Sequence, residues 1–384
     1  MKIIYITTSI EENDYIEFDK LWTVSLNPSN QNFHNKMIRS FALQNEVEVI
    51  SIRPFSRAKC NIKVLKAETK KVNNITYHYL KINRNKLFRV AKLKKQVKNL
   101  IPSIKTDDCV VVTDTINPKC VFITNYIQRK FKLPAIGICT DSPSNITGTS
   151  KSYTMYLLNC CNKLDGFITL TEGLNILFNA NNKKHITIEG VVESKEFKAN
   201  SNVEGKYLFF GGALLPRYGV YNLIDAFKSI DNKDVSLLIC GHHADEQKIE
   251  EAIGDDLRIK FLGCLPVSEV LALESKAIAN INPRPFTQDL DRLSIPSKTL
   301  EYLASGALTI SVKNTELEKT FKSCAIWAKT GEVKDLAAAI KDALEMSDEE
   351  RKKIAEIAKN TAISHYSLEK ISELITDFSL SFLN

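Results

Sequence analysis

The chain has 384 residues, of which 44% are hydrophobic and 25% charged, and it carries a formal net charge of +7. Its composition is that of a soluble globular protein, and its length exceeds one ordinary hydrophobic core and fits two domains of roughly 190 residues each. No run of about 18 apolar residues occurs, so we expect no membrane-spanning helix. The first nine residues are rich in β-branched side chains and lead directly to Glu11, Glu12 and Asp14, which favours a buried strand over a signal peptide.

In the N-terminal half, short apolar stretches alternate with amphipathic ones. This alternation predicts a parallel sheet covered by helices. Strands are expected at residues 3–7, 47–52, 75–79, 110–113, 135–139, 166–170 and 186–188, and helices at 32–44, 89–100, 118–131, 153–163 and 172–179. The polar stretch 193–205 has few large hydrophobic residues and is the expected linker, so we place the first domain at 1–195.

Part of this half is strongly basic. Between Arg53 and Lys105 the sequence has 16 lysines and arginines and one acidic residue, Glu68. Within it, apolar and basic side chains alternate from residue 87 to residue 98, which is typical of a basic amphipathic helix that contacts an anionic surface. The region has no base-stacking aromatic pattern and no known nucleic-acid module, so we favour an anionic membrane surface over nucleic acid. A solvated face that keeps the protein soluble is the alternative.

Several polar residues follow predicted strands of the N-terminal half. The carboxyl ends of parallel strands form the ligand-binding edge of an open sheet. Asp114 and Asp141 come directly after such strands, and Asp141 can bind sugar hydroxyls or stabilise positive charge at an anomeric carbon. Asn30, Asn32 and His34 lie in the expected loop after the first strand, where amides can hydrogen-bond a sugar. The alternative for the aspartates and the amides is a role as turn formers or helix caps.

The C-terminal half repeats the alternation of strands and helices. Strands are expected at 207–210, 236–240, 259–262, 277–281, 308–311 and 325–328, and three helical stretches follow at 333–344, 348–363 and 368–382. Ser347 is a good N-cap for the second of these stretches because acidic residues fill its first turn. We place the second domain at 206–365 and a separate C-terminal helix at 366–384.

The first strand of the second domain runs into Gly211 and Gly212. Glycines at this point let the backbone approach a pyrophosphate closely, and Arg217 in the following loop can neutralise its charge. For two glycines alone, a tight turn without a ligand is the alternative. A later helix in the same domain makes the pyrophosphate interpretation stronger.

That helix begins after a strand that ends at Asn282 and Arg284. Its first turn contains Ser297, Lys298 and Thr299 behind a proline, which suits the opening position of a helix. Unpaired N–H groups at the helix start attract an anion, and the charges of Lys298 and Arg284 add to this attraction. For Arg284, an ion pair with an aspartate of the following loop, Asp289 or Asp291, is the alternative.

One turn further along this helix lies Glu301, on the same face as Lys298. A carboxylate at this place can accept hydrogen bonds from sugar hydroxyls next to a bound phosphate. The arrangement suits a nucleotide sugar.

The Asn282-Pro283-Arg284 and Pro296-Ser297-Lys298-Thr299-x-Glu301-Tyr302 motifs, together with the Gly211-Gly212 loop, resemble the nucleotide-sugar half of retaining glycosyltransferases of family 4. The resemblance covers residues 207–328 well and the N-terminal half in outline. It implies an α/β protein with the GT-B fold: two Rossmann-like doubly wound domains face each other across a cleft, and the C-terminal helix crosses back to the first domain. The motif combination looks like a subgroup that assembles bacterial surface polysaccharides.

The chain departs from this family at three positions. The family marks its donor site with two glutamates eight residues apart; Glu301 matches the second, which contacts the ribose in relatives, whereas Leu293 occupies the place of the first. The arginine and lysine of the family's glycine loop fall at Ala213 and Tyr218. Other cations near these places are Arg217 and Lys298. Relatives often have a histidine near the place of Asp141, close to the transferred sugar.

We therefore expect a glycosyltransferase of the hexosyltransferase type. It would move a sugar from a nucleoside diphosphate sugar, UDP-linked in our interpretation, to a hydroxyl of a lipid-linked or glycan acceptor, with retention if it follows its relatives. The expected catalytic residues are Arg217, Lys298 and Asp141; the donor-binding residues are Gly211, Gly212, Asn282, Arg284, Ser297, Thr299 and Glu301; and the acceptor-binding residues are Asn30, Asn32, His34 and Asp114. Two alternatives are a nucleotide-sugar epimerase of the same fold and a catalytically silent partner subunit.

No cofactor or metal is expected, and we place the protein in the cytoplasm, peripherally at the inner face of the membrane. His242 and His243 are adjacent, which rarely allows both to bind one metal, and no third ligand motif follows. The nine cysteines include no Cys-x-x-Cys pair, and those at 109, 139 and 240 fall in predicted strands, as small core residues of a reducing cytosol do. The adjacent Cys160 and Cys161 are interpreted as packing residues.

Overall fold

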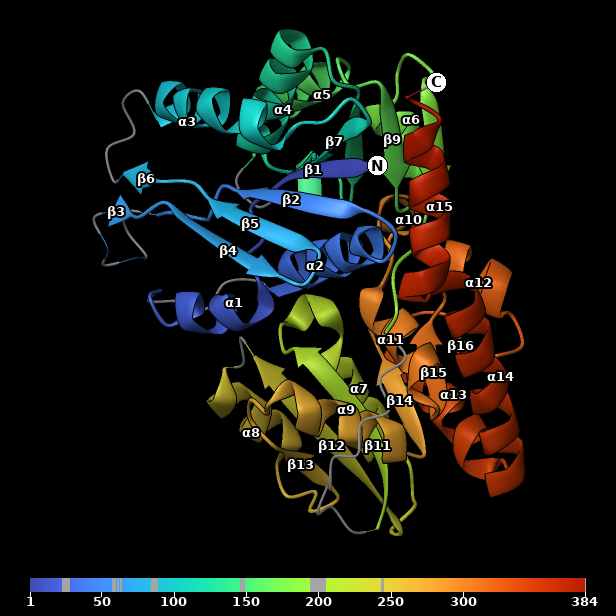
Figure 1. Cartoon of the computed structure of the whole chain (residues 1–384). Coiled ribbons are helices and arrows are strands. Elements are labelled where there is room, and N and C mark those ends of the chain that lie inside the picture. The colour runs from blue at the N-terminus through green and yellow to red at the C-terminus, as the bar shows by residue number, and fades with distance from the viewer. Residues whose placement is uncertain are drawn as a thin grey trace. The chain divides into compact units, whose positions relative to one another are not determined.

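The computed structural model describes residues 1–22, 28–56, 60, 62, 64–83, 89–145, 149–193, 205–242 and 245–383. The chain forms two compact units (Figure 1). Unit 1 comprises Met1–Val191 and Leu368–Asn384, and unit 2 comprises Val192–Ser367. Each unit has one large, mostly parallel sheet with helices packed on it, which confirms the α/β class. Most of the expected linker at 193–205 lies outside the described residues.

The described part of unit 1 contains an eight-stranded sheet in the order β10-β9-β8-β7-β1-β2-β5-β4. All neighbouring strands are parallel except β4, which runs antiparallel to β5. The strands are β1 Lys2–Thr7, β2 Glu46–Ser51, β4 Glu68–Val72, β5 Ile75–Tyr79, β7 Cys109–Asp114, β8 Ala135–Cys139, β9 Gly166–Thr169 and β10 Lys184–Thr187. Two short strands, β3 Val64–Leu65 and β6 Ile82–Asn83, pair separately.

The central strands of unit 1 are covered on both faces. In β1 the four residues 3–6 are fully buried, and in β7 every residue is buried. A strand covered on both faces needs continuous apolar residues and not an alternating pattern, which is why these strands could be recognised from runs such as Val110-Val111-Val112. The polar edge strand β4 was not predicted, because Glu68, Lys70 and Lys71 give it no apolar run.

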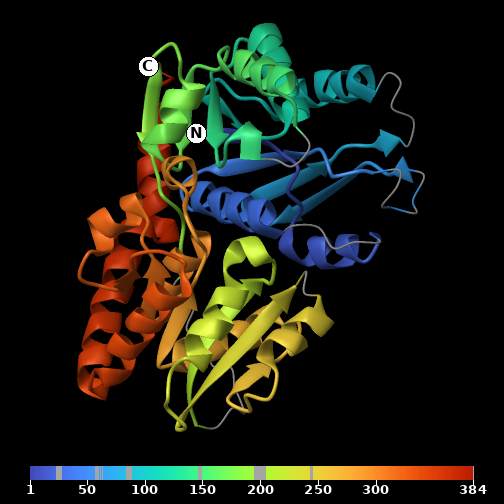
Figure 2. The same ribbon diagram turned by 180° about the vertical axis from the view of Figure 1, so that it is seen from behind.

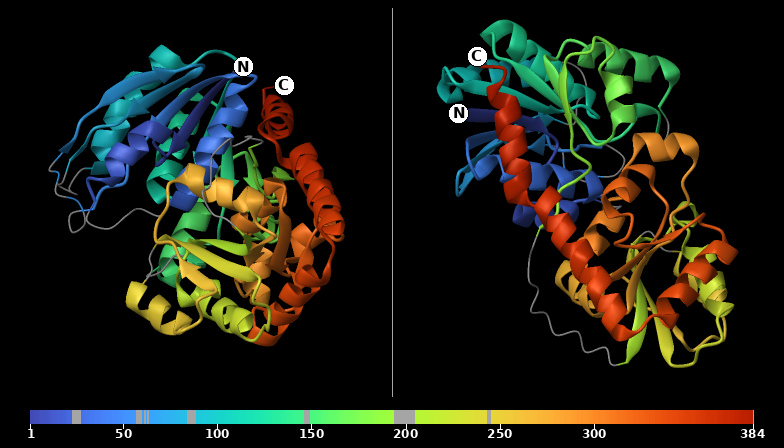
Figure 3. Two further views of the ribbon diagram at one scale, coloured as in Figure 1. Left: turned by 90° about the horizontal axis from the view of Figure 1, so that it is seen from below. Right: turned by 90° about the vertical axis from the view of Figure 1, so that its right-hand side faces the viewer.

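The helices of unit 1 pack on both faces of this sheet. They are α1 Glu12–Asp19, α2 Pro28–Ala42, α3 Arg89–Ile104, α4 Pro118–Phe131, α5 Lys151–Cys161, α6 Glu172–Phe178 and α15 Leu368–Leu380, with a 3₁₀ turn η1 at Pro143–Asn145. The crossovers β1–α2–β2 and β7–α4–β8 run in opposite directions along the sheet, and right-handed crossovers therefore place α2 and α4 on opposite faces. Helix α15 lies against α2, where Asn45 Nδ2 donates to Thr376 Oγ1 at 2.9 Å (Figure 3).

The apolar side chains along one face of the basic helix α3 are buried in the protein interior. Leu93, Val97 and Ile101 are buried, and the helix packs beside α4. The Lys94 ammonium lies 4.4 Å from the centroid of the Phe122 ring of α4. The basic amphipathic helix therefore lies where it was predicted, and Leu93, Val97 and Ile101 are not available to insert into a lipid layer. Val90 is exposed, and residues 87 and 88 of the pattern lie outside the described residues.

Unit 2 contains a six-stranded sheet whose strands are all parallel, in the order β13-β12-β11-β14-β15-β16 (Figure 2). The strands are β11 Lys206–Ala213, β12 Val235–His242, β13 Ile259–Phe261, β14 Ala279–Asn282, β15 Leu308–Val312 and β16 Ile326–Ala328. The helices are α7 Val220–Lys228, α8 Glu246–Ile253, α9 Val267–Lys276, α10 Gln288–Leu293, α11 Ser297–Ser305, α12 Thr315–Phe321, α13 Val333–Glu345 and α14 Asp348–Tyr366, with a 3₁₀ turn η2 at Pro216–Tyr218. At the start of α14, Ser347 forms a full capping box with Glu350.

The two sheets share one topological feature. In unit 1 the chain builds outward from β1 through β2 and then returns to place β7 on the other side of β1; in unit 2 it builds outward from β11 and returns to place β14 beside it. Ligands of open α/β sheets bind at such a reversal point, beyond the carboxyl ends of the strands. The two places to look for a site are thus the ends of β1 and β7, and the ends of β11 and β14.

Candidate functional site

The glycines at the end of β11 are fixed to helix α11 by one buried tyrosine. Tyr302 is fully buried, and its hydroxyl accepts a hydrogen bond from the Gly211 N–H at 3.0 Å and donates one to the Gly211 carbonyl at 3.1 Å. A phenol that satisfies both backbone groups of one residue holds the strand end and the helix in a fixed relation. The predicted glycine loop and the predicted Lys298–Glu301 helix therefore belong to one rigid site in unit 2.

A second glycine joins the glycine loop to the loop after β14. Gly219 has φ +80°, a conformation that residues with a side chain rarely adopt, and a Cβ added to it would lie 2.3 Å from the Pro283 carbonyl oxygen. Both conditions require glycine here. The close approach brings Arg217 and Tyr218, directly before Gly219, next to the segment that carries Arg284.

Two predicted cations meet around the Tyr218 ring. The guanidinium carbon of Arg217 is 5.2 Å from the ring centroid and that of Arg284 is 5.3 Å from it. Such cation–π contacts orient guanidinium groups at a surface. Arg284 also lies 5.4 Å from the ring of Phe286. The family that this chain resembles has a lysine at the place of Tyr218. Here the Tyr218 ring contacts two arginines instead.

The sequence allowed Asp291 as an ion-pair partner of Arg284. In the structure Asp291 makes other contacts. Asp291 accepts hydrogen bonds from Asn314 Nδ2 at 2.8 Å and from the Thr315 N–H at 2.9 Å. It therefore joins α10 to the start of α12. The side chain of Asp289 lies outside the described residues.

Asn282 and Thr299, predicted to bind the donor, are interior residues. Asn282 Nδ2 donates to Thr299 Oγ1 at 2.7 Å, and Thr299 Oγ1 lies 2.8 Å from Ser311 Oγ. Asn282 is 5% exposed, and Thr299 and Ser311 are fully buried. This chain of hydrogen bonds ties β14, α11 and β15 together. We therefore correct their predicted role: both side chains position the elements of the site and do not face a ligand.

The first turn of α11 is open at its surface. Pro296 is its N-cap and no side chain caps the helix, which leaves N–H groups at its start for a ligand or solvent. Ser297 is exposed at the first helical position. The role of Ser297 in donor binding stays a prediction.

Lys298, predicted as a catalytic cation, is held by two carboxylates. Its Nζ lies 3.0 Å from Glu274 Oε1 and 3.2 Å from Glu301 Oε1. Its ammonium is therefore paired within unit 2, and its role as a catalytic cation stays a prediction. Glu274 was missed by the sequence analysis. The signal was present, because Glu274 follows Ala272 and Leu273 on the buried face of α9.

The carboxylates and the lysine shift one another's pKa. Burial, and then the neighbouring charge of Glu301, raise the pKa of Glu274 to about 8. Burial opposes the charge of Lys298, but Glu301 and Glu274 outweigh this and raise its pKa well above the ordinary value. Glu274 is thus a carboxyl group that holds a proton over much of the neutral pH range.

The strand ends of unit 1 contain a buried aspartate–histidine pair. Asp114, 1% exposed, accepts hydrogen bonds from Asn30 Nδ2 at 3.2 Å and from the Ile116 N–H at 2.9 Å, and lies 3.6 Å from His34 Nε2. His34 Nδ1 is 2.7 Å from the Tyr5 hydroxyl. Burial alone would raise the pKa of Asp114, but the facing His34 and these hydrogen bonds hold it below the ordinary value.

These contacts correct the predicted acceptor loop. The expected loop is instead the beginning of α2, which starts at Pro28, and Asn27 lies outside the described residues. His34 is fully buried on the inner face of α2, whereas Asn32 is exposed on its outer face, so they cannot touch one small ligand together. Helical periodicity separates residues two positions apart, and the helix expected at 32–44 already contained both of these residues.

Asp141 follows β8 and forms a local turn. Its Oδ1 accepts hydrogen bonds from the Ser142 N–H and from Asn145 Nδ2, both at 2.7 Å. This is the alternative that the sequence allowed, an aspartate that shapes the η1 turn. The side chain is partly exposed.

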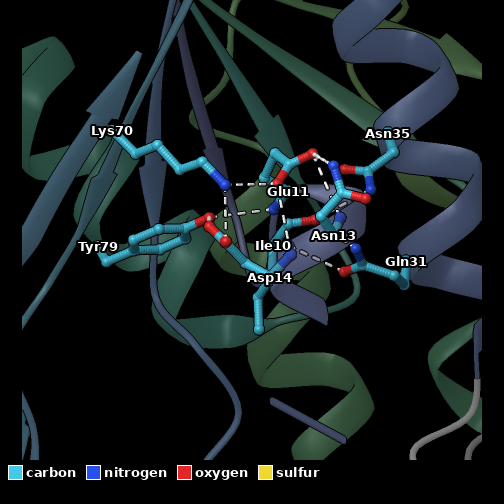
Figure 4. Close-up of polar contacts among 8 residues, drawn as sticks. All are labelled: Ile10, Glu11, Asn13, Asp14, Gln31, Asn35, Lys70 and Tyr79. Atoms are coloured by element: carbon cyan, nitrogen blue, oxygen red, sulfur yellow. Dashed lines mark hydrogen bonds and ion pairs between the residues drawn. The ribbon is translucent and has the colours of Figure 1, made fainter. Parts of the chain in front are cut away.

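A network of side chains fixes the loop after β1 (Figure 4). The Ile10 N–H donates to Gln31 Oε1 at 2.9 Å, and Asn35 Nδ2 donates to the Ile10 carbonyl at 2.9 Å. Lys70 Nζ lies 2.8 Å from Glu11 Oε2 and 2.7 Å from Asp14 Oδ1. These contacts join α1 and α2 to the edge strand β4, and the sequence analysis predicted none of them.

Metal-ligand residues do not gather in the described part of the chain. Over those residues no group of three or more histidine, cysteine, aspartate or glutamate side chains could hold a metal ion. His243 of the adjacent histidine pair lies outside them. All nine cysteines are described and free, including Cys160 and Cys161. Among the described helices, none has both the length and the apolar character needed to span a bilayer.

Comparison with known proteins agrees with this geometry. Residues 191–361, which include the glycine loop, both arginines and α11, match the family Glycosyl transferases group 1. The search of curated protein sequences gives no match. The family match lies on unit 2, where the candidate donor site is.

Solved structures match nearly the whole chain. Sucrose-phosphate synthase from Thermosynechococcus elongatus has a TM-score of 0.71 at 14% identity, with 99% of each chain covered. A glycosyltransferase from Rickettsia africae has a TM-score of 0.70 at 14% identity, with 100% of this chain and 98% of that one covered. HepE from Anabaena, solved in complex with UDP, has a TM-score of 0.68 at 13% identity, with 99% and 100% covered.

At these identities the structures show the fold, which is the GT-B fold of glycosyltransferases. The family match gives the enzyme class. The protein is a glycosyltransferase, and the part that matches group 1 is the domain that carries the two arginines and Glu301.

Proposed function

We propose that this glycosyltransferase takes its sugar from a UDP-sugar bound at the ends of β11 and β14 in unit 2. The observation that carries the proposal is the meeting of Arg217 and Arg284 at the Tyr218 ring, beside a glycine loop that is bonded to α11. Planar guanidinium groups donate hydrogen bonds in pairs and suit a diphosphate better than ammonium groups do. HepE, one of the similar structures, was solved with UDP and with UDP-glucose.

The charged groups of this proposed site have different roles. Arg217 and Arg284 neutralise the diphosphate, and the open first turn of α11 at Ser297 adds N–H donors and the positive end of the helix dipole. Glu301 accepts hydrogen bonds from the ribose hydroxyls. Charge develops on the leaving diphosphate as the sugar departs, so donors aimed at it are worth about 3 kcal/mol each in the transition state.

The reaction ends on a hydroxyl of a lipid-linked or glycan acceptor held by unit 1. The support is chemical: the carboxylate of Asp141 and the amide of Asn32 lie on partly or fully exposed positions and can bind sugar hydroxyls. Asp114 accepts a hydrogen bond from Asn30 and faces His34 in the interior of unit 1, where these side chains support the ends of β1 and β7. The leaving phosphate takes the acceptor proton, without a metal, and the anomeric configuration is retained. Such a transfer suits the synthesis of bacterial surface polysaccharides.

A lipid-linked acceptor also suits a protein that works peripherally at the inner face of the cytoplasmic membrane. Helix α3 buries its apolar stripe and presents Lys92, Lys95 and Lys98 at exposed positions. Each basic residue near an anionic surface contributes about 1 kcal/mol. Membrane association through α3 is therefore electrostatic and should weaken with salt.

The test is a transfer assay with a panel of nucleotide sugars and polyprenyl-linked acceptors, in which free nucleotide and product mass are followed. Release of UDP that depends on the acceptor, with a product heavier by one sugar, is the expected result. Proton NMR of the new linkage then reports retention or inversion. Conversion of the donor sugar without an acceptor would indicate an epimerase, and binding of UDP without turnover would indicate a silent subunit; either result contradicts the proposal.

A further inference from the structure

Glu274 is fully buried, and apolar packing alone does not explain a carboxyl group at this position. Its side chain is 0% exposed, and it lies on the face of α9 that also buries Ala272 and Leu273. Lys298 donates to Oε1, while no described group of the chain donates to Oε2. A buried carboxyl with one satisfied oxygen costs stability, and a buried ion pair can often be replaced by apolar residues without loss. A leucine would serve packing better at this place.

The lysine that Glu274 holds also contacts the surface. The Lys298 and Glu301 side chains are 31% and 33% exposed, so the three groups form a path from the interior to the surface of α11. The Lys298 ammonium lies 5.6 Å from the Tyr302 ring, whose hydroxyl binds Gly211. The path therefore ends beside the glycine loop of the candidate donor site.

We propose that Glu274 is a positioning residue of the donor site: it holds the Lys298 ammonium, which in turn fixes the Glu301 carboxylate where it accepts hydrogen bonds from the two adjacent hydroxyls of the donor's ribose. A carboxylate has about four acceptor positions, so it can accept hydrogen bonds from several groups at once. Lys298 acts through Glu301 and not on the phosphates. The inference rests on the proposed function, because it requires the nucleotide to bind beside α11.

The charges of this path make nucleotide binding depend on pH. When Glu274 is protonated, Lys298 and Glu301 balance each other; when it is ionised, two carboxylates face one ammonium and the path carries one net negative charge next to a diphosphate. The pKa of Glu274 is raised to about 8 by burial and by Glu301. UDP affinity should therefore fall as the pH rises through about 8.

The titratable and polar groups around Glu274 include side chains of α11, β12, β11 and β14. Burial raises the pKa of Tyr302 far above its ordinary value and that of Cys240 to about 12, and the two glutamates raise that of Lys298 against the effect of its burial. Tyr207 on β11 donates to the Leu273 carbonyl, and Asn280 on β14 donates to the Glu274 carbonyl.

The experiment compares the full-length wild type with Glu274→Leu, Glu274→Gln and a control, Glu269→Gln, which removes an exposed carboxylate from the same helix. UDP binding is measured by calorimetry from pH 6 to pH 9.5, and donor KM and kcat are measured at pH 7. In Glu274→Leu we expect UDP affinity to fall about tenfold and donor KM to rise by a similar factor, while kcat changes little.

Glu274→Gln separates positioning from charge. The glutamine carbonyl still accepts a hydrogen bond from Lys298, so affinity at pH 7 should stay within about twofold of wild type. Because glutamine does not ionise, the loss of affinity above pH 8 should disappear. Glu269→Gln should behave as wild type in all measurements.

Two results would overturn the inference alone: a wild type that binds UDP together with a Glu274→Leu variant of equal affinity, or a Glu274→Gln variant that keeps the decline through pH 8. If Glu274→Leu does not fold, the pH profile of Glu274→Gln decides. A wild type that binds no UDP at any pH would overturn the proposed function as well.

Discussion

Each unit has one point at which the strand order of its sheet reverses. The two points have the same topology but differ in how far their charged groups are buried. At the ends of β1 and β7 the titratable groups are buried and face one another, as Asp114 and His34 do at 3.6 Å. At the ends of β11 and β14 the arginines lie at the surface around Tyr218, beside a glycine loop. An edge whose polar groups face one another in the interior suits a sugar acceptor, whereas an edge with two arginines around a tyrosine suits a diphosphate. The comparison shows that fold alone does not assign the ligand.

The prediction with the largest expected effect concerns the two arginines at the strand ends of unit 2. Changing both Arg217 and Arg284 to alanine should reduce transfer at least a thousandfold, since each lost donor costs about 3 kcal/mol and the two act on one group. UDP release with saturating acceptor is the measurement. Lys260→Ala, which removes an exposed charge from β13, is the control and should retain activity. A double variant with wild-type rates would place the diphosphate elsewhere.

The second test breaks the buried pair of unit 1. Asp114→Ala should lower the free energy of unfolding by about 3 kcal/mol, because it leaves buried donors and His34 without their partner. Urea denaturation measures this, and UDP affinity should remain as in wild type because unit 2 holds the nucleotide.

The same aspartate gives the pH dependence of stability a definite sign. Its pKa is depressed in the folded state, so its contribution is present above its unfolded pKa, near 4, and is lost as the pH falls through the folded value. The isosteric variant Asp114→Asn should lack this loss at low pH. Equal acid sensitivity of both proteins would show that the pair does not stabilise unit 1.

A third test concerns where unit 1 carries its positive charge. Helix α3 has Lys92, Lys95 and Lys98 at exposed positions, so changing all three to glutamine should weaken binding to anionic vesicles by about 3 kcal/mol, roughly a hundredfold. Sedimentation with vesicles of anionic and of neutral lipid measures the effect. Activity on a soluble acceptor should persist. Equal binding of both proteins would exclude α3 as the membrane contact.

The smallest expected effect is steric. Gly219→Ala and Gly263→Ala both place a side chain at positive φ, but a Cβ at 219 meets the Pro283 carbonyl, whereas nothing lies within 4 Å of one at 263. The first should cost about 2 kcal/mol of unfolding free energy and weaken UDP binding, and the second about 1 kcal/mol with UDP binding unchanged. Equal effects would mean that contact with the β14 loop is unimportant.

Much of the fold could be predicted because buried parallel strands are continuous apolar runs. Segments such as β5, β8 and α4 have the bounds expected from sequence. The missed elements lack that signal: β4 is polar, and α1 has few apolar residues and one buried side chain, Phe18. A local sequence pattern shows which residues are buried. The positions of β4 and α1 depend instead on contacts with residues far along the chain, such as Tyr79.

The sequence named the elements that carry the candidate site but did not show which of their side chains are buried. Asn282 and Thr299 look like ligand donors in sequence, yet they bond to each other in the interior. Lys298 looks like a phosphate cation, yet its partner Glu274 is 24 positions away on another helix. Pairing across elements is a three-dimensional property, so one sequence could not supply it.

The polar edge strand β4 has a further consequence for how this protein behaves at high concentration. An exposed strand edge offers unpaired backbone groups to the edge of another molecule, and charged side chains oppose such pairing. Glu68, Lys70 and Lys71 supply these charges on β4. At the opposite edge, Lys184 of β10 donates to the Ser381 carbonyl just beyond α15, which partly covers that strand. Removing the C-terminal helix should therefore expose a sheet edge that promotes aggregation.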